Sequence, residues 1–218
     1  MHRLELCGIL LNTSPEVYEP AEDTLLTIEA LSKCLGSFEK AQSSGLRVLD
    51  MGTGTGIIGL FAARSRAVAD VLLADKSSEA VAIARSNAAL NVKLCRKCRV
   101  IRSNLFDAIS GRFEIIVMNA PYLRHEPGEP EREAEMLSGG DEGIELSVAF
   151  LSAAKRHLSS HGVVLLSASS LSNQDKLLRH AATEGYVIKE KASMHLFFED
   201  IIVYTFALGS TDGNARGK

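Results

Sequence analysis

Short apolar runs alternate with amphipathic helical segments along most of this chain, and this alternation constrains the fold more than any other feature. The apolar runs are nearly continuous in Val, Ile and Leu, which is typical of strands buried on both faces of a parallel sheet. Strands are predicted at residues 46–52, 70–77, 98–104, 113–119, 162–169, 186–196 and 200–208. Helices are predicted at residues 20–35, 56–65, 78–91, 143–160 and 172–185.

The last two predicted strands have no helix between them. Because a parallel crossover needs about a dozen residues or more, these two strands should be antiparallel. The sequence therefore predicts an α/β fold with a seven-stranded, mainly parallel, doubly wound sheet whose last strand is antiparallel. We expect a single domain over residues 1–208, with an N-terminal entry segment and helix at residues 1–45, and a disordered polar tail at residues 209–218.

The charge balance and the apolar runs exclude some classes of protein. The chain has 24 Lys and Arg against 27 Asp and Glu, a formal net charge of −3. It therefore lacks the overall excess of positive charge that would indicate nucleic acid as a partner. No apolar run reaches the ~18 residues of a membrane span. The N-terminus also lacks the cationic region and the cleavage site of a signal peptide. These features predict a cytoplasmic protein that does not associate with a membrane.

The cysteines are Cys7, Cys34, Cys95 and Cys98, in a chain too large to be a small secreted scaffold. Reduced thiols in the cytoplasm are therefore expected. Cys95 and Cys98 have the spacing of zinc ligands, but no second pair or suitable histidines lie nearby, so no metal site is predicted. We expect a surface turn with two free thiols, and a local disulfide is the less favoured alternative.

A glycine-rich turn, "VLDMGTGTGIIG", follows the strand at residues 46–52. Such a turn lets the backbone approach a ligand closely, and the following helix N-terminus supplies free N–H groups. Gly54, Gly56 and Gly59 match the G-x-G-x-x-G pattern of dinucleotide-binding proteins, and Asp75 stands where those proteins place a ribose-binding acid. A nicotinamide-dependent enzyme is therefore a competing hypothesis, and a glycine turn without a ligand is another.

Asp50 directly precedes this turn and favours a different ligand. A carboxylate at the strand end would repel a pyrophosphate and would attract a cation. S-adenosylmethionine carries a sulfonium and an ammonium group and no phosphate. Asp75 would accept hydrogen bonds from ribose hydroxyls in either cofactor.

The strand at residues 113–119 ends on Asn119, which is followed by Ala120, Pro121 and Tyr122. Pro121 has a fixed φ and pushes Ala120 into the extended region. Taken alone, this stretch could be an ordinary turn at the end of a strand.

Several motifs together resemble a known family. The stretch "LDMGTGTG" and Asp75 are similar to the first two motifs of class I S-adenosylmethionine-dependent methyltransferases, whose Rossmann-like sheet has an antiparallel last strand. The stretch "NAPY" resembles the N-P-P-Y motif of enzymes that methylate planar nitrogens, such as HemK-like release-factor glutamine methyltransferases and adenine-N6 DNA methyltransferases. The stretches "VYEPAEDT" and "GGDEGIE" resemble the archaeal and eukaryotic HemK-like branch. Bacterial relatives carry a helical N-terminal substrate domain, which we expect to be absent here because only about 45 residues precede the strand before the glycine turn.

The resemblance implies a role for each matching residue. The side-chain carbonyl of Asn119 and the backbone carbonyl of Ala120 would accept the two N–H groups of a planar NH₂, and Tyr122 would flank the target group. The implied catalytic residues are Asn119, Ala120, Pro121 and Tyr122, and the implied cofactor contacts are Thr24, Asp50, Gly52, Gly54, Gly56, Asp75, Asn104 and Asn119.

Two positions depart from the family pattern. Ala120 stands where proline is usual, which removes rigidity but keeps the backbone carbonyl. Asn104 stands where an aspartate usually accepts a hydrogen bond from adenine, and its amide oxygen can still accept one without a charge. Glu22 and Asp23 either belong to the entry segment's contacts with the cofactor or interact with the dipole of their own helix.

The acid-rich segment at residues 123–142 directly follows this motif, so we expect it beside the substrate entrance. An acidic rim favours a basic protein surface over DNA, although a solvated run of charges is the alternative. The resemblance implies methylation of the glutamine in the Gly-Gly-Gln loop of a translation release factor, with a small zinc-binding activator subunit as partner. An adenine-N6 methyltransferase acting on nucleic acid and a non-catalytic cofactor-binding subunit remain alternatives.

Overall fold

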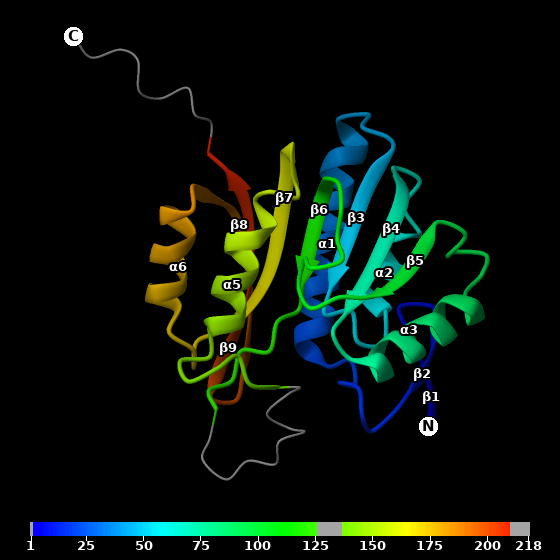
Figure 1. The fold of residues 1–218 in the computed structure, drawn as a ribbon, viewed down its shortest axis with the longest axis horizontal. Coiled ribbons are helices and arrows are strands. Elements are labelled where there is room, and N and C mark those ends of the chain that lie inside the picture. Colours follow the sequence, from blue (N-terminus) through cyan, green and yellow to red (C-terminus); the bar gives the residue numbers. More distant parts are fainter. Residues whose placement is uncertain (1, 126–136, 210–218) are drawn as a thin grey trace.

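A seven-stranded sheet runs through the centre of the molecule (Figure 1). The computed structural model describes residues 2–125 and 137–209. The strand order is β5-β4-β3-β6-β7-β9-β8; neighbours from β5 to β7 are parallel, and β9 is antiparallel to both β7 and β8. The strands are β3 (Leu46–Met51), β4 (Val68–Asp75), β5 (Cys98–Arg102), β6 (Phe113–Met118), β7 (Leu158–Ser169), β8 (Tyr186–Leu196) and β9 (Glu199–Leu208). The predicted fold class is confirmed.

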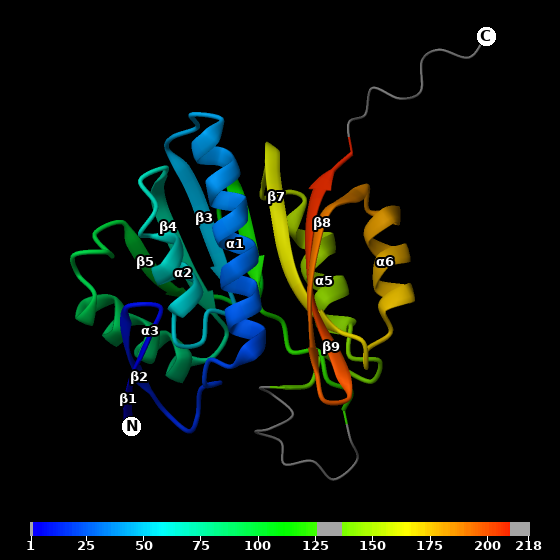
Figure 2. The same ribbon diagram turned by 180° about the vertical axis from the view of Figure 1, so that it is seen from behind.

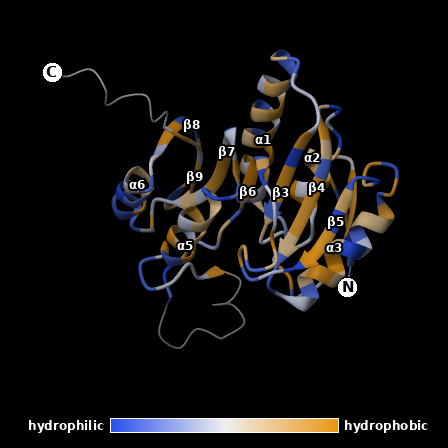
Figure 3. Ribbon diagram, turned by 45° about the horizontal axis from the view of Figure 1, so that its top comes forward, coloured by the Kyte–Doolittle hydropathy of each residue, from blue (hydrophilic) through white to orange (hydrophobic). Residues whose placement is uncertain are grey.

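Helices cover both faces of the sheet (Figures 1 and 2). Alternate residues of a strand point to opposite faces, so Val48 of β3 faces one apolar core and Leu49 faces the other. The first core contains side chains from α1 (Glu22–Lys40) and α2 (Ile57–Ala62), and α3 (Ser78–Leu90) packs against it through the partly buried Ala88. The second core contains side chains from α5 (Glu145–Ala154) and α6 (Gln174–Thr183). Figure 3 shows that apolar residues dominate the central strands, whereas α6 carries many polar ones.

Two of the predicted helix ends were wrong. The predicted helix at residues 20–35 continues as α1 through Gly36 to Lys40, because Leu35 and Phe38 extend its apolar stripe onto the core. This packing outweighs the roughly 1 kcal/mol that a glycine costs inside a helix. The predicted helix at residues 143–160 ends as α5 at Ala154, because the chain from Leu158 onward already pairs with β6 as part of β7.

An N-terminal hairpin was not predicted from the sequence. Strands β1 (His2–Leu6) and β2 (Ile9–Thr13) pair through a two-residue turn, in which Cys7 and Gly8 both have positive φ, 51° and 71°. None of the helices in the described part of the chain is long and apolar enough to cross a membrane.

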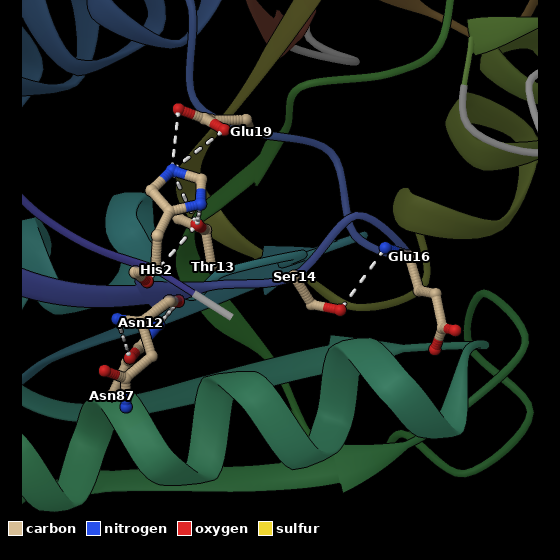
Figure 4. A network of polar contacts seen from close by, with 7 residues as sticks. All are labelled: His2, Asn12, Thr13, Ser14, Glu16, Glu19 and Asn87. Atoms are coloured by element: carbon tan, nitrogen blue, oxygen red, sulfur yellow. Dashed lines mark hydrogen bonds and ion pairs between the residues drawn. The ribbon is translucent and has the colours of Figure 1, made fainter.

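Asn87 of α3 holds this hairpin on the rest of the fold. The buried side-chain amide donates to the backbone oxygens of Asn12 (3.0 Å) and Thr55 (2.8 Å), and its oxygen accepts from the Asn12 N–H at 2.7 Å. Figure 4 shows Asn12 lying against Asn87, and His2 between Thr13 and Glu19. One side chain therefore joins the hairpin to the glycine-rich turn that contains Thr55.

Cys95 and Cys98 form a disulfide, so the expectation of two free thiols was wrong. The turn between α3 and β5 brings their Cα atoms to 5.0 Å, which is within the range that a disulfide requires.

We predict that Asn87→Ala lowers the free energy of unfolding by about 2–4 kcal/mol, because it leaves buried backbone groups of the hairpin and the glycine turn without partners. Urea unfolding followed by circular dichroism measures the change. Ser86→Ala is the matched control, because it removes only the single hydrogen bond from the Asn12 side chain at 2.9 Å. Equal losses in the two variants would contradict the role assigned to Asn87.

Candidate active site

A cavity of about 680 Å³ lies at the carboxyl ends of β3, β4 and β6. In open α/β sheets this is the usual place for a ligand, where connections from neighbouring strands leave in opposite directions. The structure brings together most of the residues predicted from the sequence: Thr24, Gly52, Gly54, Asp75, Asn104, Asn119, Ala120, Pro121 and Tyr122 all line the cavity. Asp50 and Gly56 are not among the lining residues.

Asp75 at the end of β4 fixes the glycine turn and faces the cavity. One carboxylate oxygen accepts from the Gly54 N–H at 3.0 Å, and the other accepts from the Ser77 N–H at 3.0 Å. A carboxylate can accept about four hydrogen bonds, so Asp75 keeps capacity for the hydroxyls of a ligand.

The expectation that Asp50 faces a cationic ligand was wrong. Its side chain is 1% exposed and points toward α2, because it alternates along β3 with Leu49 and Met51, which face the other way. One carboxylate oxygen, Oδ2, accepts from the Thr53 hydroxyl at 2.6 Å and from the Gly59 N–H at 2.8 Å. Asp50 therefore holds the glycine turn from beneath.

Gly56 also supports the turn and does not contact the cavity. Its φ is 87°, and a Cβ atom there would lie 3.2 Å from the side chain of Leu73. The glycine lets the turn pack closely on β4.

The pKa of Asp50 is raised to about 7. Burial is the largest cause, because it disfavours the charged form; the nearby charge of Asp75 acts in the same direction, and the hydrogen bonds from Thr53 and Gly59 act against it. The second oxygen, Oδ1, is buried and has no hydrogen-bond partner within the described residues, so it is a suitable place for the proton.

Asn119 is held by Asp23, a contact that sequence reasoning missed. The Asn119 amide nitrogen donates to Asp23 Oδ2 at 2.9 Å, across 96 residues of chain, and lies 3.4 Å from the Thr24 hydroxyl. Since both partners can accept from an NH₂ group, the amide is oriented with its oxygen away from them. That oxygen is buried and has no hydrogen-bond partner in residues 2–125 and 137–209.

Asp23 is buried at the start of α1 and gathers several donors. It accepts from its own neighbour Thr24, through the N–H at 2.6 Å and the hydroxyl at 3.2 Å, and from the Tyr18 hydroxyl at 3.0 Å. Asp23 was expected either to contact the cofactor or to interact with the dipole at the start of its helix. Neither expectation included its hydrogen bond from the Asn119 amide.

Two tyrosines line the cavity next to Asp23. Burial raises the pKa of Tyr18 and of Tyr122, and the negative charge of Asp23 raises both further. Each phenol therefore stays neutral at physiological pH and can donate a hydrogen bond. Tyr122 was predicted from the sequence, whereas Tyr18 was not singled out.

The cavity wall is strongly acidic. Lys76 is the only Lys or Arg among the described residues that line it, and the lining carboxylates are Glu16, Asp23, Asp75, Asp141 and Glu199. A negative wall favours a ligand with cationic groups and disfavours a pyrophosphate. The volume, the negative wall and the acceptor at Asp75 fit S-adenosylmethionine, so the negative charge expected from Asp50 is supplied by other residues.

The backbone carbonyl of Ala120 lies beside Asn119 in the motif. It accepts a hydrogen bond from the Ser167 hydroxyl of β7 at 3.4 Å, and Ala120 is 2% exposed. A carbonyl oxygen has a second lone pair, so it retains the capacity to accept from a ligand.

The described ends of the acid-rich segment meet at the cavity. The Leu123 N–H donates to the Leu137 oxygen at 3.0 Å, and the Gly139 N–H donates to the Leu123 oxygen at 2.8 Å. Both ends line the cavity, and residues 126–136 lie outside the described residues, as do residues 210–218 of the predicted tail. Within the described ranges, no group of three or more His, Cys, Asp or Glu is placed to hold a metal ion.

Comparison with known proteins gives consistent matches. The family described as "methyltransferase small domain" matches residues 28–197. A candidate protein N5-glutamine methyltransferase of Methanocaldococcus jannaschii is 30% identical over 204 residues, which cover 92% of this chain and 96% of that one. The release factor glutamine methyltransferase of Agrobacterium fabrum is 37% identical over 170 residues, and the match covers 75% of this chain but only 58% of that enzyme.

Solved structures share the fold. The E. cuniculi Mtq2–Trm112 complex, described as responsible for methylation of the translation termination factor eRF1, matches with a TM-score of 0.62 at 21% identity, over 89% of this chain and 99% of that chain. A ribosomal protein L11 methylase from Lactobacillus delbrueckii matches with a TM-score of 0.65 at 21% identity, over 92% and 86% of the two chains.

We predict that Asp50 makes the protein less stable as pH rises from about 4 to about 7. In this range the folded chain keeps the Asp50 proton and the unfolded chain, with a pKa near 3.9, has lost it. One such group contributes a slope of at most about 1.4 kcal/mol per pH unit. Asp50→Asn should remove this slope, as measured by urea unfolding between pH 4.5 and 8.

Asp107→Asn, at an exposed carboxylate, is the control and should leave the slope unchanged. An unchanged slope in Asp50→Asn would show that Asp50 does not take up this proton.

Proposed function

The chain belongs to the methyltransferase small domain family, and we propose that it methylates the side-chain amide nitrogen of a glutamine in a protein. It is an S-adenosylmethionine-dependent methyltransferase with a Rossmann-like fold. The proposed substrate is the glutamine of a Gly-Gly-Gln loop in a translation release factor. Two similar proteins support this choice: the Agrobacterium relative is a release factor glutamine methyltransferase, and the Mtq2–Trm112 complex methylates eRF1.

The observation that carries the proposal is the state of the Asn119 amide. Its nitrogen is bound to Asp23, and its buried oxygen is left to accept from a ligand. A planar NH₂ group has two N–H donors and a delocalised lone pair, so it is a weak nucleophile that needs exact placement. The Asn119 oxygen and the Ala120 carbonyl are the two acceptors that such a group requires.

The same contacts stabilise the charge that develops during transfer. S-adenosylmethionine, when bound, supplies an electrophilic methyl group on a sulfonium. As the amide nitrogen attacks, its N–H groups become more positive, and fixed carbonyl oxygens stabilise them without reorganising. The negative charge of Asp23 polarises the Asn119 amide and makes its oxygen a stronger acceptor. The alkylated nitrogen is acidic enough to release its proton to water.

Replacement of the usual proline by Ala120 is compatible with this role. The acceptor is a backbone carbonyl, which every residue has. The Ser167 hydroxyl bonds to that carbonyl from β7 and limits its movement, which offsets some of the rigidity that a proline would add.

The partner and the cellular location are part of the proposal. A small activator subunit is proposed because the structurally similar Mtq2 chain was solved with Trm112. We place the enzyme in the cytoplasm, where translation termination factors act. The acidic cavity wall supports a protein substrate over nucleic acid, because carboxylates repel phosphates.

We predict that Asn119→Ala lowers the rate of methyl transfer at least ~100-fold, because it removes one of two transition-state acceptors. Radiolabelled S-adenosylmethionine is incubated with the enzyme and a release factor with an intact Gly-Gly-Gln loop. The controls are the same factor with its glutamine changed to alanine, and duplex DNA. Cofactor affinity, measured by calorimetry, should change less than about threefold.

Label on DNA alone would instead favour an adenine-N6 methyltransferase. Bound cofactor with no label on any substrate would indicate a non-catalytic subunit.

We further predict that Asp23→Ala lowers kcat about 10- to 100-fold, because the Asn119 amide loses the contact that fixes its orientation. The KM for the release factor should change little, and an unchanged circular dichroism spectrum and urea midpoint would separate a positioning role from a general loss of folding. Glu22→Ala is the control, since Glu22 is the neighbouring exposed carboxylate. Equal loss of kcat in both variants would contradict the specific role of Asp23.

A further inference from the structure

We infer that Phe197 and Phe198, at the tip of the β8–β9 hairpin, form a docking contact for the polypeptide segment that flanks the acceptor glutamine. The inference rests on the proposed function and deepens it, because it assigns a surface for the protein substrate outside the cavity. Four features of the hairpin carry it: exposure, backbone conformation, anchoring and position.

The two phenylalanines are the most exposed large apolar residues of the described chain, at 91% and 94%. Neither ring contributes to a core, so burial in the folded chain does not explain their presence. Adjacent, almost fully exposed rings on a folded domain indicate a surface that another molecule covers.

The backbone at Phe197 adds an independent observation. Leu196 and Glu199 pair across a two-residue turn, and Phe197 has a φ of 45°. The first position of such a turn usually holds glycine, because a bulky side chain is strained at positive φ. A phenylalanine at this position is therefore unfavourable for folding, and strain of this kind concentrates at functional sites.

The tip is anchored firmly at the mouth of the cavity. Glu199, directly after the turn, lines the cavity and accepts a hydrogen bond from the Ser169 hydroxyl. The Asp200 N–H donates to the Ser170 hydroxyl at 2.8 Å, and the Ser170 N–H donates back to the Asp200 oxygen at 2.9 Å. These bonds hold the tip end of the hairpin on the end of β7, next to β6, which the candidate catalytic motif directly follows.

Figure 2 shows the β8–β9 turn at the same end of the sheet as the start of α1, and Figure 1 shows that β6 ends toward the same side. Asp23 and Asn119 lie at these two ends. A polypeptide whose glutamine enters the cavity would therefore pass the hairpin tip.

The chemistry of the surroundings selects a polypeptide as the partner. Phenylalanine rings have no polar group, so they bind apolar side chains and the flat faces of peptide groups. Nucleic-acid bases also stack on such rings, but proteins that bind single strands combine the rings with a positively charged groove. Here the adjoining cavity wall carries carboxylates, including Glu199 itself.

The test is a double variant, Phe197→Gly with Phe198→Ser, in the full-length enzyme with its activator present if turnover requires one. Glycine suits the φ at position 197, so this variant should fold at least as well as the wild type. We expect the KM for the release factor to rise about tenfold or more, as for loss of an aromatic interface contact. The kcat should stay within about twofold, and the affinity for S-adenosylmethionine should not change.

Val92→Ser is the matched control, because Val92 is 59% exposed on the turn after α3 and its loss should leave the KM unchanged. An unchanged KM in the double variant, or a loss of cofactor affinity, would overturn the inference while leaving the proposed function intact. Failure of the wild-type enzyme to label any protein glutamine would overturn both. A wild-type preference for single-stranded RNA over the release factor, lost in the double variant, would overturn the polypeptide as partner.

Discussion

The hydrogen bond from the Asn119 amide to Asp23 connects the two halves of the site. It joins the end of β6 to the start of α1, so the entry segment becomes part of the candidate site. The acceptor is a carboxylate and the bond is partly buried, and hydrogen bonds to a charged group are stronger than neutral ones. It also fixes the orientation of the amide, because a carboxylate can only accept, so the amide nitrogen faces Asp23 and the amide oxygen faces away from it. The free oxygen beside the Ala120 carbonyl follows from that one choice.

The carboxylates of the site fall into two groups, one buried under the glycine turn and one lining the cavity. Asp50 is buried and its pKa is raised to about 7. Below that pH its carboxyl group is mostly uncharged, so it supports the glycine turn by hydrogen bonds without placing a full negative charge under it. The carboxylates that line the cavity, such as Asp75 and Glu199, are the ones placed to interact with a ligand. A cofactor with two positive groups and a protein substrate both suit such a wall, whereas phosphates do not.

Much of the fold could be predicted because parallel sheets have a strong sequence signal. The Val- and Ile-rich runs, and the lack of a helix between β8 and β9, were enough to predict the sheet and its antiparallel last strand. The N-terminal hairpin was missed because its strands are short and its turn is marked by a single glycine. The end of α1 was misplaced because Gly36 is a weak break when the apolar stripe continues past it.

The candidate site divides in the same way. The sequence by itself determined which residues reach the ends of β3, β4 and β6, because each lies directly after a buried run of strand residues. It also predicted methyltransferase chemistry, through the resemblance of the glycine turn, Asp75 and the "NAPY" motif, in that order, to a known family. Only the tertiary structure decided that the Asp50 side chain lies under the glycine turn, that Asp23 contacts Asn119 and that Glu199 lines the cavity. These contacts join segments far apart in the chain, and local periodicity contains no information about which distant side chains meet.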